Sequence, residues 1–246
     1  MGGSLLGRFR FICVLGGPGS GRGTHCRRLQ RELNVAHFST GALLRQAVEE
    51  RHPAAGNIEG AMAAGEPVAE PVVYSVLKAA CARAVREDPA RVVLFDGFPR
   101  DAEQTRWMQR TFGEPELVVF LDCPHSVMVQ RVTARDTRSD PLRSDGREAA
   151  ELFRPDNTES AAHTLIHRFN VDTLPIMDVF GTKVKILQSD AAIEQVYQDV
   201  LVCVGGRIKQ TDGITQEALA EARSPSKDDA AAAAECAKAA LDELIK

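Results

Sequence analysis

The sequence predicts an α/β fold with a parallel sheet of about five strands flanked by helices. Four short apolar runs are continuous rather than alternating, which is typical of strands buried on both faces. Each run is followed by a turn signal and then by a helix-compatible segment, as crossover connections between parallel strands require. The 246 residues suffice for one such domain or for two small ones.

The elements follow from these patterns in chain order. The expected strands are residues 11–15, 92–95, 117–121 and 184–187, with a weaker one at 36–38. The expected helices are residues 21–33, 42–50, 71–86, 102–111, 124–134, 159–179 and 192–204. Pro71 and Pro124 suit a first helical turn, and Asp101 and Ser126 are candidate capping residues.

Two segments break the alternation. Residues 136–153 are polar, rich in Arg and Asp, and contain Pro141 and Gly146, so we expect a mobile surface insertion. From Gly205 onward the chain is polar and then Ala-rich, with a linker at about 210–228. The prediction is therefore one domain over residues 1–204 and an appended tail over 205–246, for which the sequence identifies no partner.

Composition excludes several classes of protein. A net charge of −4 argues against a broad nucleic-acid or anionic-membrane surface. The six cysteines form no CxxC pair, which favours neither a disulfide framework nor a zinc motif, and Cys13 and Cys123 lie in apolar runs as small hydrophobes. No apolar stretch resembles a membrane span or a signal-peptide core. We expect a cytoplasmic monomer.

The most informative segment is the glycine-rich run Gly16 to Thr24. It follows an expected strand and opens an expected helix, the context in which backbone N–H groups and a helix N-terminus surround phosphate. We expect ATP contacts from Gly17, Pro18, Gly19, Ser20, Gly21, Arg22, Gly23 and Thr24. Arg22 stands where such loops carry Lys, so charge is kept while a planar fork replaces a point charge. The alternative is a turn that only joins strand to helix.

Two further blocks make the pattern specific. They read His-Phe-Ser-Thr-Gly-Ala-Leu-Leu-Arg at 37–45 and Phe-Asp-Gly-Phe-Pro-Arg at 95–100. With the glycine-rich loop they resemble, in order and spacing, the adenylate kinase family, which includes adenylate and UMP/CMP kinases. The resemblance covers about residues 10–204 and implies a P-loop NTPase-type sheet with a small acceptor-binding helical segment and a lid. Ala42 departs from the family block, which normally has Asp there.

Asp96 ends an expected strand at the edge of the sheet where ligands bind in open α/β folds. Its carboxylate there suits Mg²⁺ held mostly through water, with Thr24 or Ser20 in the same shell. The alternative role is to cap the following turn. The resemblance implies that Arg45 and Arg100 grip the acceptor monophosphate, because Arg donates to phosphate in a bidentate manner. Without the resemblance, the alternative interpretation of each arginine is a solvated charge on the surface.

A further set of residues is expected to contact the acceptor nucleotide and its base. Gln104 lies one helical turn after Arg100, and its amide both donates and accepts. The resemblance implies that AMP-specific members carry Thr and Gln at the positions of Thr40 and Gln104, whereas pyrimidine-specific members tend toward Ala and Asn. It also implies acceptor contacts from Gly65, Val68 and Gly97.

The donor phosphates need arginines that balance the charge spreading over the transferred group. Arg131 and Arg135 lie four residues apart on one helix and are expected at ATP. Arg154 and Arg168 resemble the lid arginine and the arginine of the following helix, which reach both the transferred group and AMP. Because the insertion is longer than a short lid, three other arginines remain alternatives to Arg154, namely Arg138, Arg143 and Arg147.

The resemblance implies a nucleoside-monophosphate kinase that moves the γ-phosphoryl group of Mg·ATP to AMP. The expected catalytic residues are Arg22, Arg135, Arg154, Arg168 and Asp96. Closure of segments 40–80 and 135–159 would exclude water from the transfer. Two alternatives stay open: a catalytically weak nucleotide-binding regulator, on account of Arg22 and Ala42, and a UMP/CMP kinase.

Overall fold

The computed structural model describes residues 10–63, 66–87, 92–134 and 159–212. The chain divides into two compact units, Met1–Arg207 and Ile208–Lys246. The sheet and the site described below belong to the first unit. No helix among the described residues is both long enough and apolar enough to cross a membrane.

The first unit is built on a five-stranded sheet in the order β2-β3-β1-β4-β5, in which every neighbouring pair is parallel. The strands are β1 (Phe11–Gly16), β2 (Ala36–Ser39), β3 (Val93–Asp96), β4 (Leu117–Asp122) and β5 (Val184–Gln188). All five expected strands are therefore confirmed, including the weak one. β5 is an edge strand and is not buried throughout, since Ile186 is 64% exposed.

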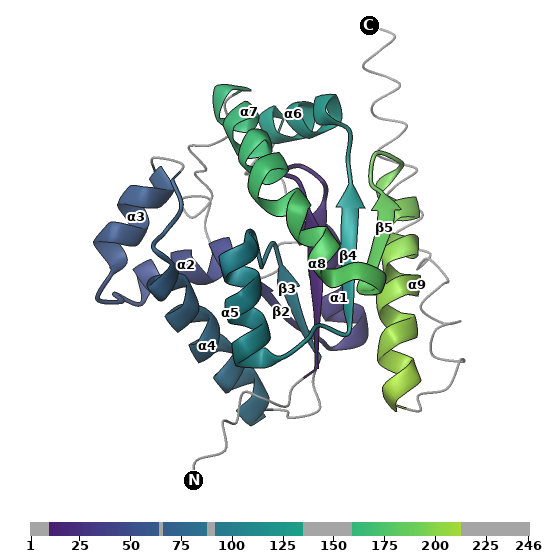
Figure 1. The fold of residues 1–246 in the computed structure, drawn as a ribbon, viewed down its shortest axis with the longest axis horizontal. Helices are drawn as coiled ribbons and strands as arrows, with labels where there is room; N and C mark the ends of the chain where they lie inside the picture. Colours follow the sequence, from purple (N-terminus) through teal and green to yellow (C-terminus); the bar gives the residue numbers. More distant parts are fainter. Residues whose placement is uncertain (1–9, 64–65, 88–91, 135–158, 213–246) are drawn as a thin grey trace, which may run out of the picture. The chain divides into compact units, whose positions relative to one another are not determined.

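Helices connect and cover the strands (Figure 1). They are α1 (Arg22–Leu33), α2 (Thr40–Glu49), α3 (Ala55–Ala63), α4 (Glu70–Glu87), α5 (Ala102–Phe112), α6 (His125–Thr133), α7 (Glu159–Arg168), α8 (Met177–Phe180) and α9 (Ile193–Asp212). Between α7 and α8 lie a π-helical turn, η2 (Phe169–Thr173), and a 3-10 turn, η3 (Leu174–Ile176), and η4 (Gly181–Lys183) precedes β5.

Three expectations about helices need correction. The sequence prediction missed α3, which lies inside the expected acceptor-binding segment. The helix expected over 159–179 changes type after Arg168, and Pro175 supplies a reason, because it has no N–H for a continuous α-helix. The last helix does not end at Val204 but runs through Gly205 and Gly206 to Asp212.

Helix starts agree with the expectations in part. Asp101 caps α5, since its side chain accepts a hydrogen bond from the backbone N–H of Gln104 at 2.8 Å. Ser126 does not cap α6, because that helix begins at His125 and has Pro124 as its N-cap.

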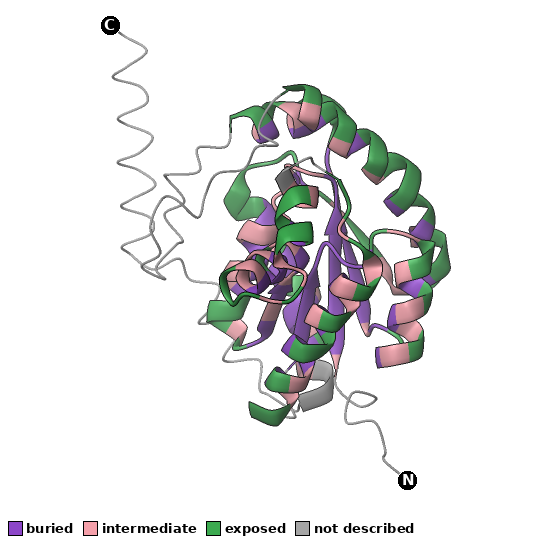
Figure 2. Cartoon of the chain, turned by 90° about the vertical axis from the view of Figure 1, so that its left-hand side faces the viewer, coloured by how far each residue is buried: buried purple, intermediate pink, exposed green. Residues whose placement is uncertain are grey.

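Alternate residues of the central strand enter two apolar layers. Phe11, Cys13 and Leu15 belong to the core cluster formed with α2, α4, α5 and α8. On the other side, α1 and α9 meet where the rings of His25 and Tyr197 stack with centroids 6.1 Å apart. Figure 2 shows the result: the strands are buried, and the outward faces of the helices are exposed. This packing fixes the strand ends that carry the site.

The register of the strands brings polar residues together at one edge. Asp96 of β3 pairs with Val14 of β1 on one side and with Ser39 of β2 on the other. The glycine-rich loop begins two residues after Val14, and α2 begins directly after Ser39. The carboxyl ends of three parallel strands therefore meet at one place, as open α/β sheets require for a ligand site.

Candidate functional site

The loop between β1 and α1 has the backbone of a phosphate cradle. Gly16, Gly19 and Gly21 have φ angles of 148°, 83° and 90°, which side-chain-bearing residues rarely adopt. Gly21 is the N-cap of α1 and offers no side chain to the first helical N–H groups. Those N–H groups and the helix dipole thus remain available to an anion. The residues expected at ATP lie in this loop, from Gly17 to Gly21, and in the first turn of α1, as Arg22, Gly23 and Thr24.

The loop rests on α6. A Cβ added at Gly17 would lie 2.2 Å from Sδ of Met128, and one at Gly19 would lie 2.8 Å from the Met128 carbonyl oxygen. Arg131, one turn further along α6, donates from Nη1 to the Ser189 carbonyl at 2.7 Å and reaches the Gly19 carbonyl at 3.5 Å. The structure therefore places Arg131 beside the loop, and its contact with ATP stays a prediction.

Arg22 folds back onto its own loop. Its Nη1 donates to the carbonyl of Gly16, and its Nε lies 3.5 Å from Oδ1 of Asp96. The guanidinium packs against Gly97, whose φ of 69° favours glycine, and a Cβ there would lie in van der Waals contact with Arg22 at 3.4 Å. The cation thus lies against its own loop, with one donor on the Gly16 carbonyl and its Nε near Asp96.

Asp96 is held by two cationic or potentially cationic groups. Besides Arg22 at Oδ1, Nε2 of His37 lies 3.2 Å from Oδ2. Burial by itself would raise the pKa of Asp96, but the His37 hydrogen bond and the charges of Arg22, His37 and Arg100 outweigh it and hold that pKa below its ordinary value. A carboxylate at the strand end is therefore present as an anion.

Arg100 and Gln104 form one structural unit with Gly97. The backbone N–H of Arg100 donates to Oε1 of Gln104 at 3.0 Å, and Nε of Arg100 donates to the Gly97 carbonyl at 3.1 Å. Because Oε1 of Gln104 is engaged in this way, its amide nitrogen is the group left to donate to a ligand. Thr173 of η2 holds the same turn by donating to the Arg100 carbonyl at 2.7 Å.

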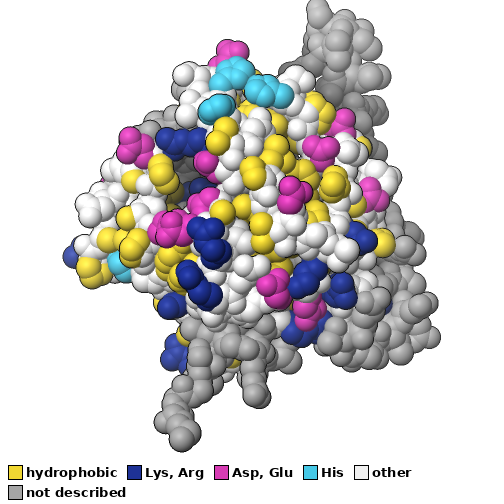
Figure 3. Space-filling view, viewed as in Figure 1, with side chains coloured by type: hydrophobic (Ala, Val, Ile, Leu, Met, Phe, Trp, Pro, Cys, Tyr) yellow, Lys and Arg dark blue, Asp and Glu magenta, His cyan; other side chains and the backbone are white. Residues whose placement is uncertain are grey.

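The other expected acceptor residues lie on α2 and before α4. Thr40 opens α2, is 5% exposed, and its Oγ1 has no hydrogen-bond partner within the described residues. Arg45 lies one turn further along α2, with Nη1 3.5 Å from a Cβ placed at Gly41. Val68 is partly buried against the core. A hollow in the surface between the α2–α3 region and α7 contains Lys or Arg side chains (Figure 3).

Arg168 ends α7, where the chain enters the π-helical turn η2. The next residue, Phe169, reaches the phosphate loop, with its ring 3.4 Å from a Cβ placed at Gly17, and it stacks on Phe120. π-Helical turns occur frequently at functional sites. The structure thus brings the end of α7 to the loop, and the role of Arg168 at the phosphates stays a prediction.

Other expected site residues lie outside the described residues. These are Gly65, Arg135, Arg154 and most of the expected lid over 135–159, together with Arg138, Arg143 and Arg147. Their roles stay predictions.

Histidines gather at the α6–α7 end of this face (Figure 3). On α7, Nδ1 of His163 lies 3.2 Å from Nε2 of His125 on α6, with both side chains exposed.

Sequence reasoning missed two contributors. His37 appears in the sequence only as the first residue of the 37–45 block, whereas its Nε2 lies in hydrogen-bond contact with Asp96. Met128 appears in the sequence as an ordinary apolar residue of a helix, whereas its carbonyl excludes a Cβ at Gly19 and its side chain would have to move to admit one at Gly17. The sequence contains little indication of this contact. Its one hint is that Met128 lies seven residues after Leu121, the end of an expected strand of the same sheet.

The parallel sheet, the left-handed glycine loop and the converging arginines define a P-loop protein built for phosphoryl transfer. Comparison with known proteins agrees with this class. The adenylate kinase family model matches residues 14–185.

Curated relatives cover most of the same region. The chain is 32% identical to uridylate kinase of Saccharomyces cerevisiae over 192 residues, which is 77% of this chain and 87% of the relative. It is 32% identical to probable UMP-CMP kinase 1 of Arabidopsis thaliana over 78% of this chain and 86% of the relative. It is 29% identical to adenylate kinase isoenzyme 1 of Caenorhabditis elegans over 72% and 78%, respectively.

The chain therefore belongs to the adenylate kinase family. It is a phosphotransferase of the nucleoside-monophosphate kinase type. The relatives carry both uridylate and adenylate names, so they fix the class of acceptor and not its base.

Proposed function

We propose that the chain transfers the γ-phosphoryl group of Mg·ATP to AMP, giving two ADP. The observation that carries this proposal is the Arg100–Gln104 unit, which joins a phosphate-binding cation to a base-reading amide on one turn. The free amide nitrogen of Gln104 suits a ring nitrogen of adenine. Thr40, with a buried hydroxyl that lacks a partner in the described part of the chain, supports the same acceptor.

The residues at the strand ends suit Mg²⁺. Asp96 and Thr24 offer oxygen ligands, and Ser20 is 1% exposed with no partner for its Oγ among the described residues. Oxygen donors of this kind fit a hard cation that keeps several waters. Mg²⁺ bound with ATP would offset charge on the phosphates. The loop N–H groups would orient the donor, and Arg22, Arg131 and Arg168 would add positive charge around it.

Acceptor profiling tests this function. With Mg·ATP as donor, AMP, dAMP, UMP and CMP are compared by a coupled assay for ADP, and kcat/KM for AMP is expected to exceed the pyrimidine values. A higher value for UMP or CMP would replace the proposal by a UMP/CMP kinase, which the names of two relatives favour.

A second candidate function is a nucleotide-binding regulator with little turnover. One observation favours it: Arg22 donates to the Gly16 carbonyl and lies near Asp96, so its guanidinium is directed to protein groups and not toward a phosphate site. Tight ATP binding, measured by calorimetry, together with background turnover for all four acceptors would support the regulator and exclude the kinase.

A further inference from the structure

Three metal-ligating side chains meet beneath the phosphate loop. They are Cys26 from α1, His37 from β2 and Asp96 from β3, and their ligand atoms all lie within 4.8 Å of one another. His37 and Asp96 are already 3.2 Å apart, from Nε2 to Oδ2. The proposed kinase reaction needs neither Cys26 nor His37 at the phosphates, so the cluster calls for a separate explanation.

The separations are close to those of a tetrahedral centre. Zn²⁺ bonds of about 2.0–2.3 Å to nitrogen, oxygen and sulfur place neighbouring ligand atoms roughly 3.3–3.8 Å apart. The His37–Asp96 distance of 3.2 Å lies just below this range, and the upper bound of 4.8 Å for the cluster requires at most about 1 Å of side-chain adjustment. One sulfur, one imidazole nitrogen and one carboxylate oxygen are a donor set for a borderline-soft ion, unlike the all-oxygen set that Mg²⁺ prefers.

The backbone holds these ligands rigidly. His37 and Asp96 lie on hydrogen-bonded neighbouring strands, in the register that pairs His37 with Leu94 and Ser39 with Asp96. Cys26 is fully buried on α1, and this helix packs on β2 and β3. Ligands on a helix and two strands are positioned better than ligands on loops.

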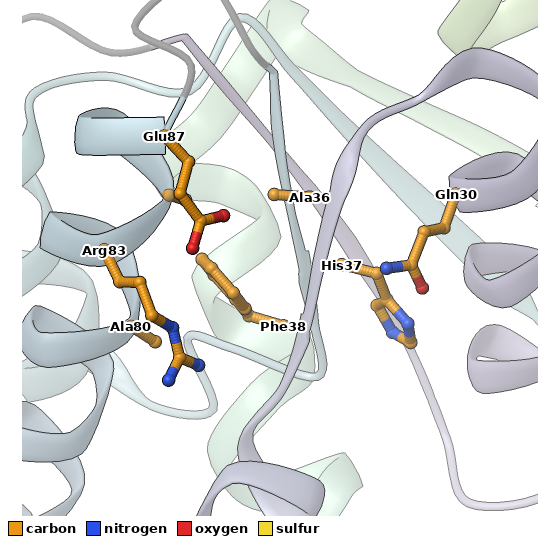
Figure 4. Close-up of a pocket in the computed structure, with 8 residues that line it drawn as sticks. Gln30, Ala36, His37, Phe38, Ala80, Arg83 and Glu87 are labelled. Carbon is orange, nitrogen blue, oxygen red and sulfur yellow. The ribbon is translucent and has the colours of Figure 1, made fainter. Parts of the chain in front are cut away.

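One ligand of the cluster also lines a cavity. A cavity of about 120 Å³ lies between α1, β2 and α4, and His37 is part of its lining. Figure 4 shows His37 beside Gln30, with Glu87 and Arg83 on the α4 side. Of the three ligands, His37 is thus the one that lines this cavity.

We propose that Cys26, His37 and Asp96 bind a divalent transition-metal ion of the Zn²⁺ type, with water as the fourth ligand. On binding, the Cys26 thiol gives its proton to solvent and binds as thiolate, and His37 binds through Nε2 as a neutral imidazole that carries its ring proton on Nδ1. Asp96 then turns from Arg22 and from Mg²⁺ to the new ion. Resting on the proposed kinase function, the consequence is that micromolar transition metal inhibits phosphoryl transfer.

Metal binding is tested directly with Co²⁺ on the full chain after treatment with a chelator. Co²⁺ bound by a thiolate gives a near-ultraviolet charge-transfer band, which is independent of activity. One equivalent per chain is expected to produce this band. Cys26→Ser should abolish it, and His37→Gln should weaken Co²⁺ affinity by at least roughly tenfold, since even outer partners of a metal site cost 10–100-fold.

Matched controls keep the test sharp. Cys81→Ser removes another fully buried cysteine, and Cys203→Ser a partly buried one, and both should keep the band. Circular dichroism checks that each variant is folded. Absence of a thiolate band in the folded wild-type chain would overturn the proposal, as would a band that survives Cys26→Ser.

Inhibition is measured separately, with Zn²⁺ added in excess of what ATP binds. The wild-type chain should lose activity at Zn²⁺ concentrations that leave Cys26→Ser at least tenfold less affected. If Co²⁺ binds but the chain turns over no acceptor, the metal site stands and the kinase function fails. If the kinase is active but binds no Co²⁺, the metal site fails alone.

Discussion

Substitution of Arg22 by Lys tests how the phosphate loop works. The guanidinium donates to the Gly16 carbonyl and lies 3.5 Å from Oδ1 of Asp96, with its side chain 24% exposed. To follow a moving phosphoryl group it must leave at least one of these partners. The ammonium group of Lys is a compact point charge whose donors rotate freely, whereas the donors of the guanidinium are fixed in one plane.

The magnitude follows from the contact that has to break. A hydrogen bond to a charged group contributes about 1.5–3 kcal/mol. If that contact is lost on the way to the transition state, turnover is slowed roughly 10- to 100-fold, because each 1.36 kcal/mol is tenfold in rate. Arg22→Lys is therefore expected to raise kcat by roughly 10- to 100-fold. The same loss of contacts should lower the free energy of unfolding by about 1 kcal/mol, because the groups are partly solvated.

The assay is steady-state ADP formation from Mg·ATP and AMP, with calorimetry for the ATP dissociation constant. Arg106→Lys, an exposed position of α5, controls for the change of residue type. A selective rise in kcat with little change in ATP affinity identifies an effect confined to the transition state. An unchanged or lower kcat in Arg22→Lys would refute the reasoning.

Four further changes test other parts of the site. Arg131→Met removes the donor to Ser189 and Gly19 and should weaken ATP binding by roughly tenfold or more in calorimetry, whereas an unchanged dissociation constant would exclude a donor-side role. Gly17→Ala places a methyl against Met128 and should destabilise the fold by about 1–3 kcal/mol in urea unfolding; equal stability would mean that α6 moves freely. Gln104→Ala should lower kcat/KM for AMP by roughly tenfold while UMP changes little, and equal losses for both would contradict base reading. Asp96→Asn should abolish most turnover and also change the pH dependence of stability. Since the pKa of Asp96 is depressed in the folded chain, its contribution is complete above the unfolded value of about 3.9 and disappears as pH falls through the folded value. The difference in unfolding free energy between wild type and Asp96→Asn should thus be constant from pH 7 to 5 and shrink below pH 4, and a constant difference at all pH values would contradict the ion-pair explanation.

Local patterns in the sequence determined the architecture and the position of the phosphate loop. Continuous apolar runs predicted four of the five strands, because a strand buried on both faces needs apolar residues at successive positions, and β2 was predicted from a weaker signal. The glycines of the loop were readable for the same reason, since φ angles of 83° and 90° exclude most other residues. Helix α3 was missed because its residues show little separation of apolar and polar faces.

Only the tertiary structure decided which side chains meet. Cys26, His37 and Asp96 are separated by up to 70 positions in the chain, and nothing in their local sequence indicates that the register of β2 and β3 and the packing of α1 bring them within 4.8 Å. The same holds for Met128 under the loop and for Arg22 turned back on Gly16. Backbone preferences act between neighbours along the chain and can be read from it, whereas side-chain contacts depend on how the strands and helices pack.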